Sequence, residues 1–134
     1  MSLKVLYKAI AYLRLSKEDG DEAESNSIRN QRILIEDYVK RQADIKLIGE
    51  KVDDGYSGVN FDRPGFQEMM ELIRDGKVNC VIVKDLSRFA RNFVESGKYL
   101  QQIFPFLNVR FIAINDNYDS LKADYQTNNL YVPI

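Results

Sequence analysis

Short apolar runs alternate with amphipathic stretches along this chain, and that alternation constrains its fold more than any other feature. The run VNCVIV (78–83) is the most apolar and indicates a buried central strand. Further extended runs lie at 7–16, 45–52 and 109–114. Strands that alternate with helices are typical of a parallel sheet covered on both faces. We therefore expect an α/β fold, an open and mainly parallel sheet of about four or five strands in the order 2-1-3-4, with helices on both faces.

Three helices are expected between these strands. The first follows an acidic stretch at 17–24, which we expect to be a solvated loop, and has its cap among residues 25–27. The second spans 64–76, with proline at its first position and glycine at its end. The third spans 89–107, and its expected inward residues are Phe93, Leu100, Ile103, Phe104 and Leu107.

The composition removes several kinds of chemistry. The chain has no histidine, which excludes Ser-His-Asp catalysis, Cys-His catalysis and histidine metal ligation. Its one cysteine, Cys80, cannot form an internal disulfide or a thiolate zinc site, which fits a reducing compartment. The net charge of −1 gives no global sign of a nucleic acid or membrane partner, and no apolar run approaches the roughly 18 residues of a membrane span. An anion site must therefore be local.

Arginines gather where the predicted strands end. Ligands of open α/β sheets bind outside the carboxyl ends of the strands, at the switch in strand order, and strands one and three flank that point here. One serine and four arginines are expected to converge there: Ser16, Arg14, Arg63, Arg88 and Arg91. Arginine grips phosphate oxygens bidentately and keeps its charge, and a serine beside it can attack phosphorus. The last two arginines fall in the first turn of the third helix, where cations are unfavourable unless an anion is held.

Other functions fit the same α/β plan. A receiver-type signalling domain would use Asp85, at the end of the third strand, as a phospho-acceptor with Mg²⁺, but it gives the arginines no role. A nucleotide-binding module lacks the Gly-rich phosphate loop it needs after a strand. A non-catalytic assembly domain is the third alternative, which Ser16→Ala would test.

Three motifs in order, AYLRLS, DDGYSGVNFDRPGF and VKDLSRFARN, resemble the catalytic domain of serine site-specific recombinases, the resolvase/invertase family. The resemblance is strongest to large serine recombinases and transposases of mobile elements, and it runs from about Lys8 to Asp119. It implies a resolvase-like catalytic domain in which Ser16 attacks a DNA phosphodiester. The product would be a 5′-phosphoserine linkage and a free 3′-hydroxyl, so that rejoining needs no ATP, metal or cofactor.

The resemblance also implies roles for individual residues. Arg14, Arg63, Arg88 and Arg91 match the family's arginines around the nucleophile and the scissile phosphate. Supporting positions match Tyr12, Gln31, Asp54, Ser57 and Ser87. Many relatives carry an acid where Ser87 stands, so an acid/base role is not expected there. From its residues alone, the acidic pair at 53–54 looks like paired carboxylates for acid/base work, but such a pair is more often a turn element. Its second carboxylate is expected chiefly to orient arginines.

The expected partners are double-stranded DNA and further copies of the protein. We expect residues 1–134 to be a single catalytic domain and a fragment, because family members continue into a long helix and a DNA-binding region. The full-length protein would form a homodimer and a synaptic homotetramer, without a membrane partner, in the bacterial cytoplasm on DNA. The sequence does not specify the target site, the host element, the proton acceptor for Ser16, the oligomeric state of the fragment, or the choice among excision, integration and inversion.

Overall fold

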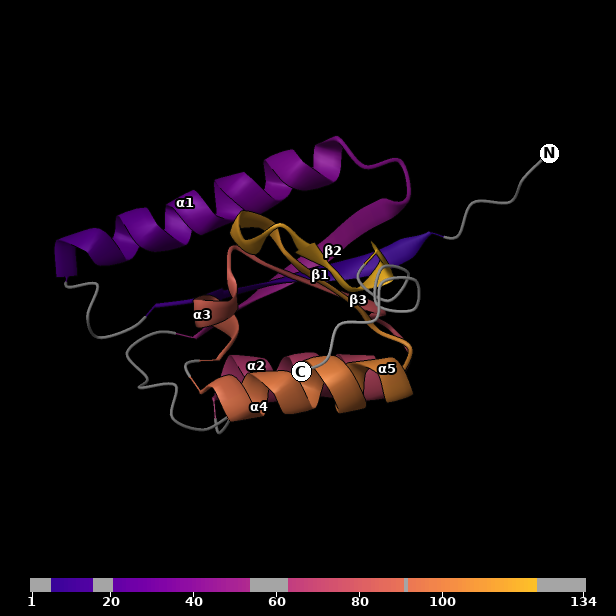
Figure 1. Cartoon of the computed structure of the whole chain (residues 1–134). Coiled ribbons are helices and arrows are strands. Elements are labelled where there is room, and N and C mark those ends of the chain that lie inside the picture. The colour runs from indigo at the N-terminus through magenta and orange to yellow at the C-terminus, as the bar shows by residue number, and fades with distance from the viewer. Residues whose placement is uncertain (1–5, 16–20, 54–62, 91, 123–134) are drawn as a thin grey trace.

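The computed structural model describes residues 6–15, 21–53, 63–90 and 92–122. They form one sheet with helices packed against it (Figure 1). The elements in chain order are β1 (Tyr7–Arg14), α1 (Asp21–Lys40), β2 (Ile45–Asp53), α2 (Pro64–Arg74), β3 (Cys80–Val83), α3 (Leu86–Phe89), α4 (Phe93–Lys98), a π-helical turn η2 (Tyr99–Ile103), α5 (Phe104–Phe106), β4 (Arg110–Ala113), a 3₁₀ turn η3 (Ile114–Asp116) and β5 (Tyr118–Asp119).

The strand order is β2-β1-β3-β4-β5, which confirms the predicted order and adds a short edge strand. The first four strands are parallel, and β5 pairs with β4 in the antiparallel direction. At the carboxyl edge Arg14 pairs with Asp53, whereas the pairing of β1 with β3 ends earlier, at Ala11 and Ile82. The last residues of β1 therefore pair with β2 but not with β3, and they lie at the switch in strand order.

Helices cover both faces of the sheet, as predicted. Figure 1 shows α1 alone on one face and α2, α4 and α5 on the other. Successive residues of a strand point to opposite faces. Ala9, Ala11 and Leu13 of β1 belong to the core under α1, whereas Ile10 and Tyr12 belong to the core shared with α2, α4 and α5.

A buried ion pair ties the edge strand to the sheet. Arg110 of β4 donates from Nε and Nη2 to the carboxylate of Asp119 in β5, at 3.0 and 2.7 Å. Its Nη1 reaches Asp44, just before β2, at 3.1 Å. Two of the five strands and the entry to a third therefore meet at one guanidinium.

The first helix begins earlier than predicted. The prediction placed a loop at 17–24 and a cap among residues 25–27, but α1 already starts at Asp21. The prediction was wrong for 21–24 because serine and asparagine, although good caps, are also tolerated inside helices, and the preceding residues include the helix formers glutamate and alanine. The second helix matches its prediction, with proline at the start of α2 and Gly76 just beyond it at a φ of +75°.

The predicted helix over 89–107 is broken into several pieces. Ala90 is extended, with φ −153° and ψ 145°, and separates α3 from α4. The segment Tyr99–Ile103 is π-helical, and the N–H of Phe104 donates to the carbonyl of Tyr99. Pro105 lacks an N–H and would crowd the carbonyl four residues earlier in an α-helix, so the wider turn accommodates it.

This break changes which side chains face inward. Phe104 is buried, and Leu100, Ile103 and Leu107 pack against the core as predicted. Phe93 was predicted inward but is 87% exposed, because the chain breaks at Ala90 and Phe93 stands at the start of α4, where it lines an open cavity instead of the core. Among the helices that the structure describes, none combines the length and apolar character needed to cross a bilayer.

Candidate active site

Arg14 occupies the last position of β1. It continues the series Ile10 and Tyr12, so its side chain lies on the face covered by α2, and it is only 1% exposed. Its Nε donates to the carbonyl of Arg88 at 3.1 Å, and its Nη2 donates to the carbonyl of Ser87. The guanidinium therefore ties the end of β1 to α3, which follows β3.

Arg88 returns the contact from α3. Its Nη1 donates to the carbonyl of Arg14 at 3.3 Å. Two segments 74 residues apart in the chain thus exchange guanidinium–carbonyl bonds at the switch point. These acceptors are main-chain carbonyls, so the bonds fix the direction in which the two arginine side chains point.

The helix that contains Arg88 differs from the prediction. Arg88 belongs to α3, a single turn whose first and last turns coincide, and not to the long helix predicted over 89–107, because the chain breaks at Ala90. Asp85 is the N-cap of α3, and its carboxylate accepts from the N–H of Arg88 at 3.2 Å and from the hydroxyl of Ser87. Arg88 therefore lies near a helix N-terminus, as predicted, although this helix is α3 rather than the predicted long helix.

Arg63 directly precedes α2 and is also 1% exposed. Its Nη2 donates to the carbonyl of Phe89 at 2.9 Å. Its guanidinium carbon lies 5.6 Å from the ring centre of Tyr12 and 5.4 Å from that of Phe66, within cation–π range. Main-chain carbonyls therefore bind all three arginines at this place. Arg14 and Arg63 donate to carbonyls of residues 87–89, and Arg88 donates to the carbonyl at the end of β1.

Gln31 supports the end of β1 from the other face. This buried residue of α1 accepts from the N–H of Arg14 at 3.2 Å and donates to its carbonyl at 3.1 Å. A side-chain amide has a carbonyl acceptor and an N–H donor, as the main chain of a neighbouring strand does. The pairing of β1 with β3 ends at Ala11, before Arg14. Gln31 therefore supplies hydrogen-bond partners to the N–H and the carbonyl of Arg14.

Tyr12 and Asp53 form a buried hydrogen-bonded pair beside Arg63. The hydroxyl of Tyr12 donates to Oδ2 of Asp53 at 2.7 Å. Burial is the largest cause of a raised pKa for Tyr12, so its phenol stays protonated and remains a donor at any physiological pH. Asp53 itself is 3% exposed.

Sequence reasoning missed Asp53, because it interpreted the acidic pair at 53–54 chiefly as a turn element. The signal that points to Asp53 is the glycine after Pro64, which indicates a close approach to the start of α2. Four predicted residues lie outside the described part of the chain: Ser16, Asp54, Ser57 and Arg91. Ser87 is exposed, and its main-chain carbonyl, rather than its hydroxyl, contacts Arg14.

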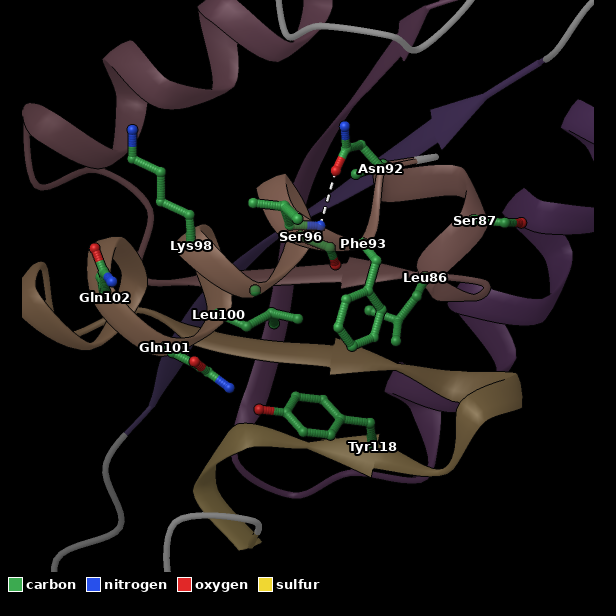
Figure 2. Close-up of a pocket in the computed structure, with 13 residues that line it drawn as sticks. Leu86, Ser87, Asn92, Phe93, Ser96, Lys98, Leu100, Gln101, Gln102 and Tyr118 are labelled. Carbon is green, nitrogen blue, oxygen red and sulfur yellow. Dashed lines mark hydrogen bonds between the residues drawn. The ribbon is translucent and has the colours of Figure 1, made fainter. Parts of the chain in front are cut away.

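A separate apolar cavity of about 700 Å³ lies beyond α3 (Figure 2). Figure 2 shows Leu86 and Phe93 extending toward the ring of Tyr118, and Leu100 lines the same cavity. Asn92 stands at the start of α4 and caps it, with its side-chain oxygen accepting from the N–H groups of Val94 and Glu95. Of the predicted site residues that the structure describes, only Ser87 lines this cavity. Within the described ranges, no three carboxylates or thiols gather in a way that could hold a metal ion.

Comparison with known proteins identifies the family. Residues 9–132 match the model of the resolvase N-terminal domain. The transposon Tn917 resolvase of Enterococcus faecalis is 38% identical over 78 residues, which cover 56% of this chain and 37% of that protein. The matched part of the chain therefore spans well under half the length of this relative.

Solved structures share the fold. A resolvase family site-specific recombinase from Streptococcus pneumoniae is 29% identical, with a TM-score of 0.68 over 92% of this chain and 90% of that one. The N-terminal catalytic domain of TP901-1 integrase superposes with a TM-score of 0.72 over 92% of this chain and 99% of that one, at 20% identity. Because the family model spans nearly the whole sequence, the chain belongs to the resolvase N-terminal domain family.

Proposed function

We propose that this chain is the catalytic domain of a serine recombinase that cuts and rejoins double-stranded DNA. Ser16 Oγ attacks the phosphorus of a backbone phosphodiester, the bond from phosphorus to the 3′-oxygen breaks, and a 5′-phosphoserine linkage forms. The serine loses a proton and the departing 3′-oxygen gains one. The number of phosphoester bonds is unchanged, so the reverse attack by a 3′-hydroxyl reseals the strand without ATP.

The observation that carries this proposal is the exchange of hydrogen bonds between Arg14 and Arg88. It places two permanently charged side chains at the end of β1, two residues before Ser16 in the sequence. Arg63 joins them from the start of α2 through the carbonyl of Phe89. A cluster of guanidinium groups at a strand end suits an anion with several oxygens, and a phosphodiester is the anion on which a resolvase-family domain would act.

The arginines would act chiefly on the transition state. Negative charge grows on the non-bridging oxygens as phosphorus is attacked, and fixed donors stabilise it more than they stabilise the ground state. Arg14, Arg63, Arg88 and Arg91 are the proposed donors, and loss of one donor of this kind typically slows a reaction about 100- to 1000-fold. Tyr12, Gln31, Asp54, Ser57 and Ser87 are proposed to support them.

The alternative of a phospho-acceptor at Asp85 is not favoured. The carboxylate of Asp85 caps α3 and binds the hydroxyl of Ser87. The family match also covers this position. A receiver-type reaction would in addition leave the three clustered arginines without a function.

We further propose the setting in which this domain works. Residues 1–134 would form one catalytic domain, and recognition of the target site would reside in other parts of the full-length protein. That protein would act as a homodimer that pairs with a second dimer on two DNA sites, in the bacterial cytoplasm.

A covalent-adduct assay tests the proposal. The DNA site is first identified by sequencing the genomic fragments that the full-length protein retains. The protein is then incubated with that DNA and resolved on a denaturing gel, and peptides of the adduct are sequenced by mass spectrometry. We expect a DNA adduct that maps to Ser16 and is absent in Ser16→Ala.

Ser25→Ala, a serine change in α1, is the matched control and should leave the adduct in place. An adduct that persists in Ser16→Ala, or one that maps to Asp85, would overturn the proposed nucleophile. Reaction of Asp85 with acetyl phosphate and Mg²⁺ would favour the receiver alternative instead.

A further inference from the structure

The carboxylate of Asp53 collects three donors from two different elements. Its Oδ2 accepts from the hydroxyl of Tyr12 in β1 at 2.7 Å and from the N–H of Phe66 at 2.9 Å. Its Oδ1 accepts from the N–H of Gly65 at 2.8 Å. All three bonds are buried, so this end of β2 is fixed to both β1 and the first turn of α2.

Asp53 caps the N-terminus of α2, although it does not belong to this helix. The first N–H groups of a helix lack partners within the helix, and a side chain at the N-cap position usually supplies one. In α2 that position belongs to Arg63, whose side chain makes no capping bond. Asp53 caps the helix from the neighbouring strand, so the side chain of Arg63 is available to reach toward α3.

Gly65 makes the close approach of the helix to Asp53 possible. A Cβ at this position would lie 2.9 Å from Oδ1 of Asp53 and 3.0 Å from its Cγ, closer than such atoms pack. Any larger residue would push the carboxylate away from the first turn of α2. The glycine and Asp53 therefore form one unit, although 12 positions separate them in the sequence.

Two of the three bonds to Asp53 hold the residues whose rings lie against Arg63. Tyr12 is held through its hydroxyl and Phe66 through its N–H. The guanidinium of Arg63 lies near the faces of both rings while its Nη2 donates to Phe89. A shift of Asp53 would move the start of α2 and a ring of β1 together, and Arg63 would move with them.

We propose that Asp53 is a positioning residue for Arg63, which it holds in the orientation that binds the scissile phosphate. This inference rests on the proposed function, in which Arg63 contacts that phosphate. In this role Asp53 acts on the rate through the helix start and the two rings. A displacement of about 1 Å in a positioned group can cost about 100-fold in rate, so its loss should be visible in the cleavage step.

The test is a double-mutant cycle in the full-length protein on its cognate DNA. Single-turnover cleavage is measured for the wild type, Asp53→Asn, Arg63→Ala and the double variant, at a temperature where circular dichroism shows each variant folded. We expect Asp53→Asn to slow cleavage by roughly 10- to 100-fold with little change in DNA affinity. In the Arg63→Ala background the same change should alter the rate less than about twofold, because the group it positions is absent.

A purely structural cap gives a different pattern. It would slow cleavage by the same factor in both backgrounds, or not at all once the folded fraction is equal, and either result would overturn the inference while leaving the proposed function intact. If Arg63→Ala itself cleaved at the wild-type rate, the proposed role of Arg63 would be wrong instead.

Two further variants keep the test decisive if Asp53→Asn does not fold. Tyr12→Phe removes one donor and keeps the ring, and Gly65→Ala presses on the carboxylate from the helix. Both should slow cleavage only when Arg63 is present. The matched control is Glu68→Gln, because Glu68 is a largely exposed acid of α2 paired with Lys51 at 2.9 Å, and this change should leave cleavage unchanged.

Discussion

The arginines of the candidate site are held by main-chain carbonyls, and this sets how each tolerates substitution. Arg14 spans the carbonyls of Ser87 and Arg88 with two different nitrogens of its planar group. A lysine has one nitrogen on a flexible stem and cannot reproduce that fork. Charge alone is therefore not sufficient at this position.

Arg14→Lys should accordingly harm both stability and cleavage. We expect a loss of about 1–3 kcal/mol in the free energy of unfolding, because a buried carbonyl loses its donor. Cleavage should slow about 100- to 1000-fold, since the fixed donor is lost. Urea unfolding and single-turnover cleavage measure the two effects. Arg32→Lys, in a half-exposed pair with Glu50, is the control and should change stability by less than about 1 kcal/mol; equal effects of the two changes would contradict this account.

Cys80 predicts how stability depends on pH. It lies in the middle of the sheet, and burial raises its pKa from 9.0 to about 12. Between these values the unfolded chain has lost the thiol proton and the folded chain has kept it, so stability falls as pH rises above about 9, by up to about 1.4 kcal/mol per pH unit. Urea unfolding at pH 8, 9 and 10 should show this decline in the wild type.

Cys80→Ala provides the comparison for this decline. It should lower stability at pH 8 but flatten the slope between pH 9 and 10, because the thiol no longer titrates. In the native wild type at pH 8, a thiol reagent should react only as fast as the chain unfolds. A slope that is unchanged in Cys80→Ala, or rapid labelling of the native protein, would show that the thiol is not protected by burial.

At the scale of elements, the sequence predicted most where hydrophobic pattern and turn chemistry agree. The four main strands and α2 lie close to where they were expected, since apolar runs of four to eight residues between polar turns have few alternatives. The rule that ligands gather at the carboxyl ends of strands correctly brought Arg14 and Arg88 to one edge. Their catalytic role stays a prediction.

What the sequence did not predict depends on backbone adjustments between elements. The split at Ala90 and the π turn before Pro105 have no distinct hydrophobic signal, so one long helix was predicted and Phe93 was placed inward although it is exposed at the start of α4. Asp53 was missed for a related reason. Its importance comes from a cap supplied across two elements, which no local spacing reveals.

Two glycines in similar sequence settings should respond in opposite directions. Gly76 follows α2 with a φ of +75°, where an alanine is strained by about 1–2 kcal/mol. Gly97 lies inside α4, where an added Cβ meets nothing within 4 Å, so alanine there should stabilise by about 0.5–1 kcal/mol. Thermal unfolding of Gly76→Ala and Gly97→Ala tests this pair. The same sign for both would mean either that Gly76 does not take the left-handed conformation after α2 or that Gly97 does not lie inside a helix.

At the scale of the whole molecule, charge is balanced overall and concentrated locally. The sequence carries 19 basic and 20 acidic residues, so DNA is not attracted to the domain as a whole. The candidate site, by contrast, gathers three arginines at the carboxyl edge of the sheet. The end of α1 lies at the other edge, beside the start of β2, where Arg41 pairs with Asp37 in an exposed (i, i+4) contact.

This distribution predicts how binding of the 134-residue chain to DNA depends on salt. Each neutralised phosphate contributes about −0.9 to the slope of log K against log salt, so contacts confined to the proposed arginines give a slope between about −1 and −4. Binding should be weak and independent of sequence. Arg88→Ala should make the slope shallower by about 1, whereas Arg41→Ala, at the opposite edge, should not change it. Fluorescence anisotropy with a labelled duplex between 50 and 200 mM salt measures these slopes. A slope steeper than about −5, or equal effects of the two substitutions, would mean that DNA contacts an extended surface rather than the edge where β1 and β3 diverge.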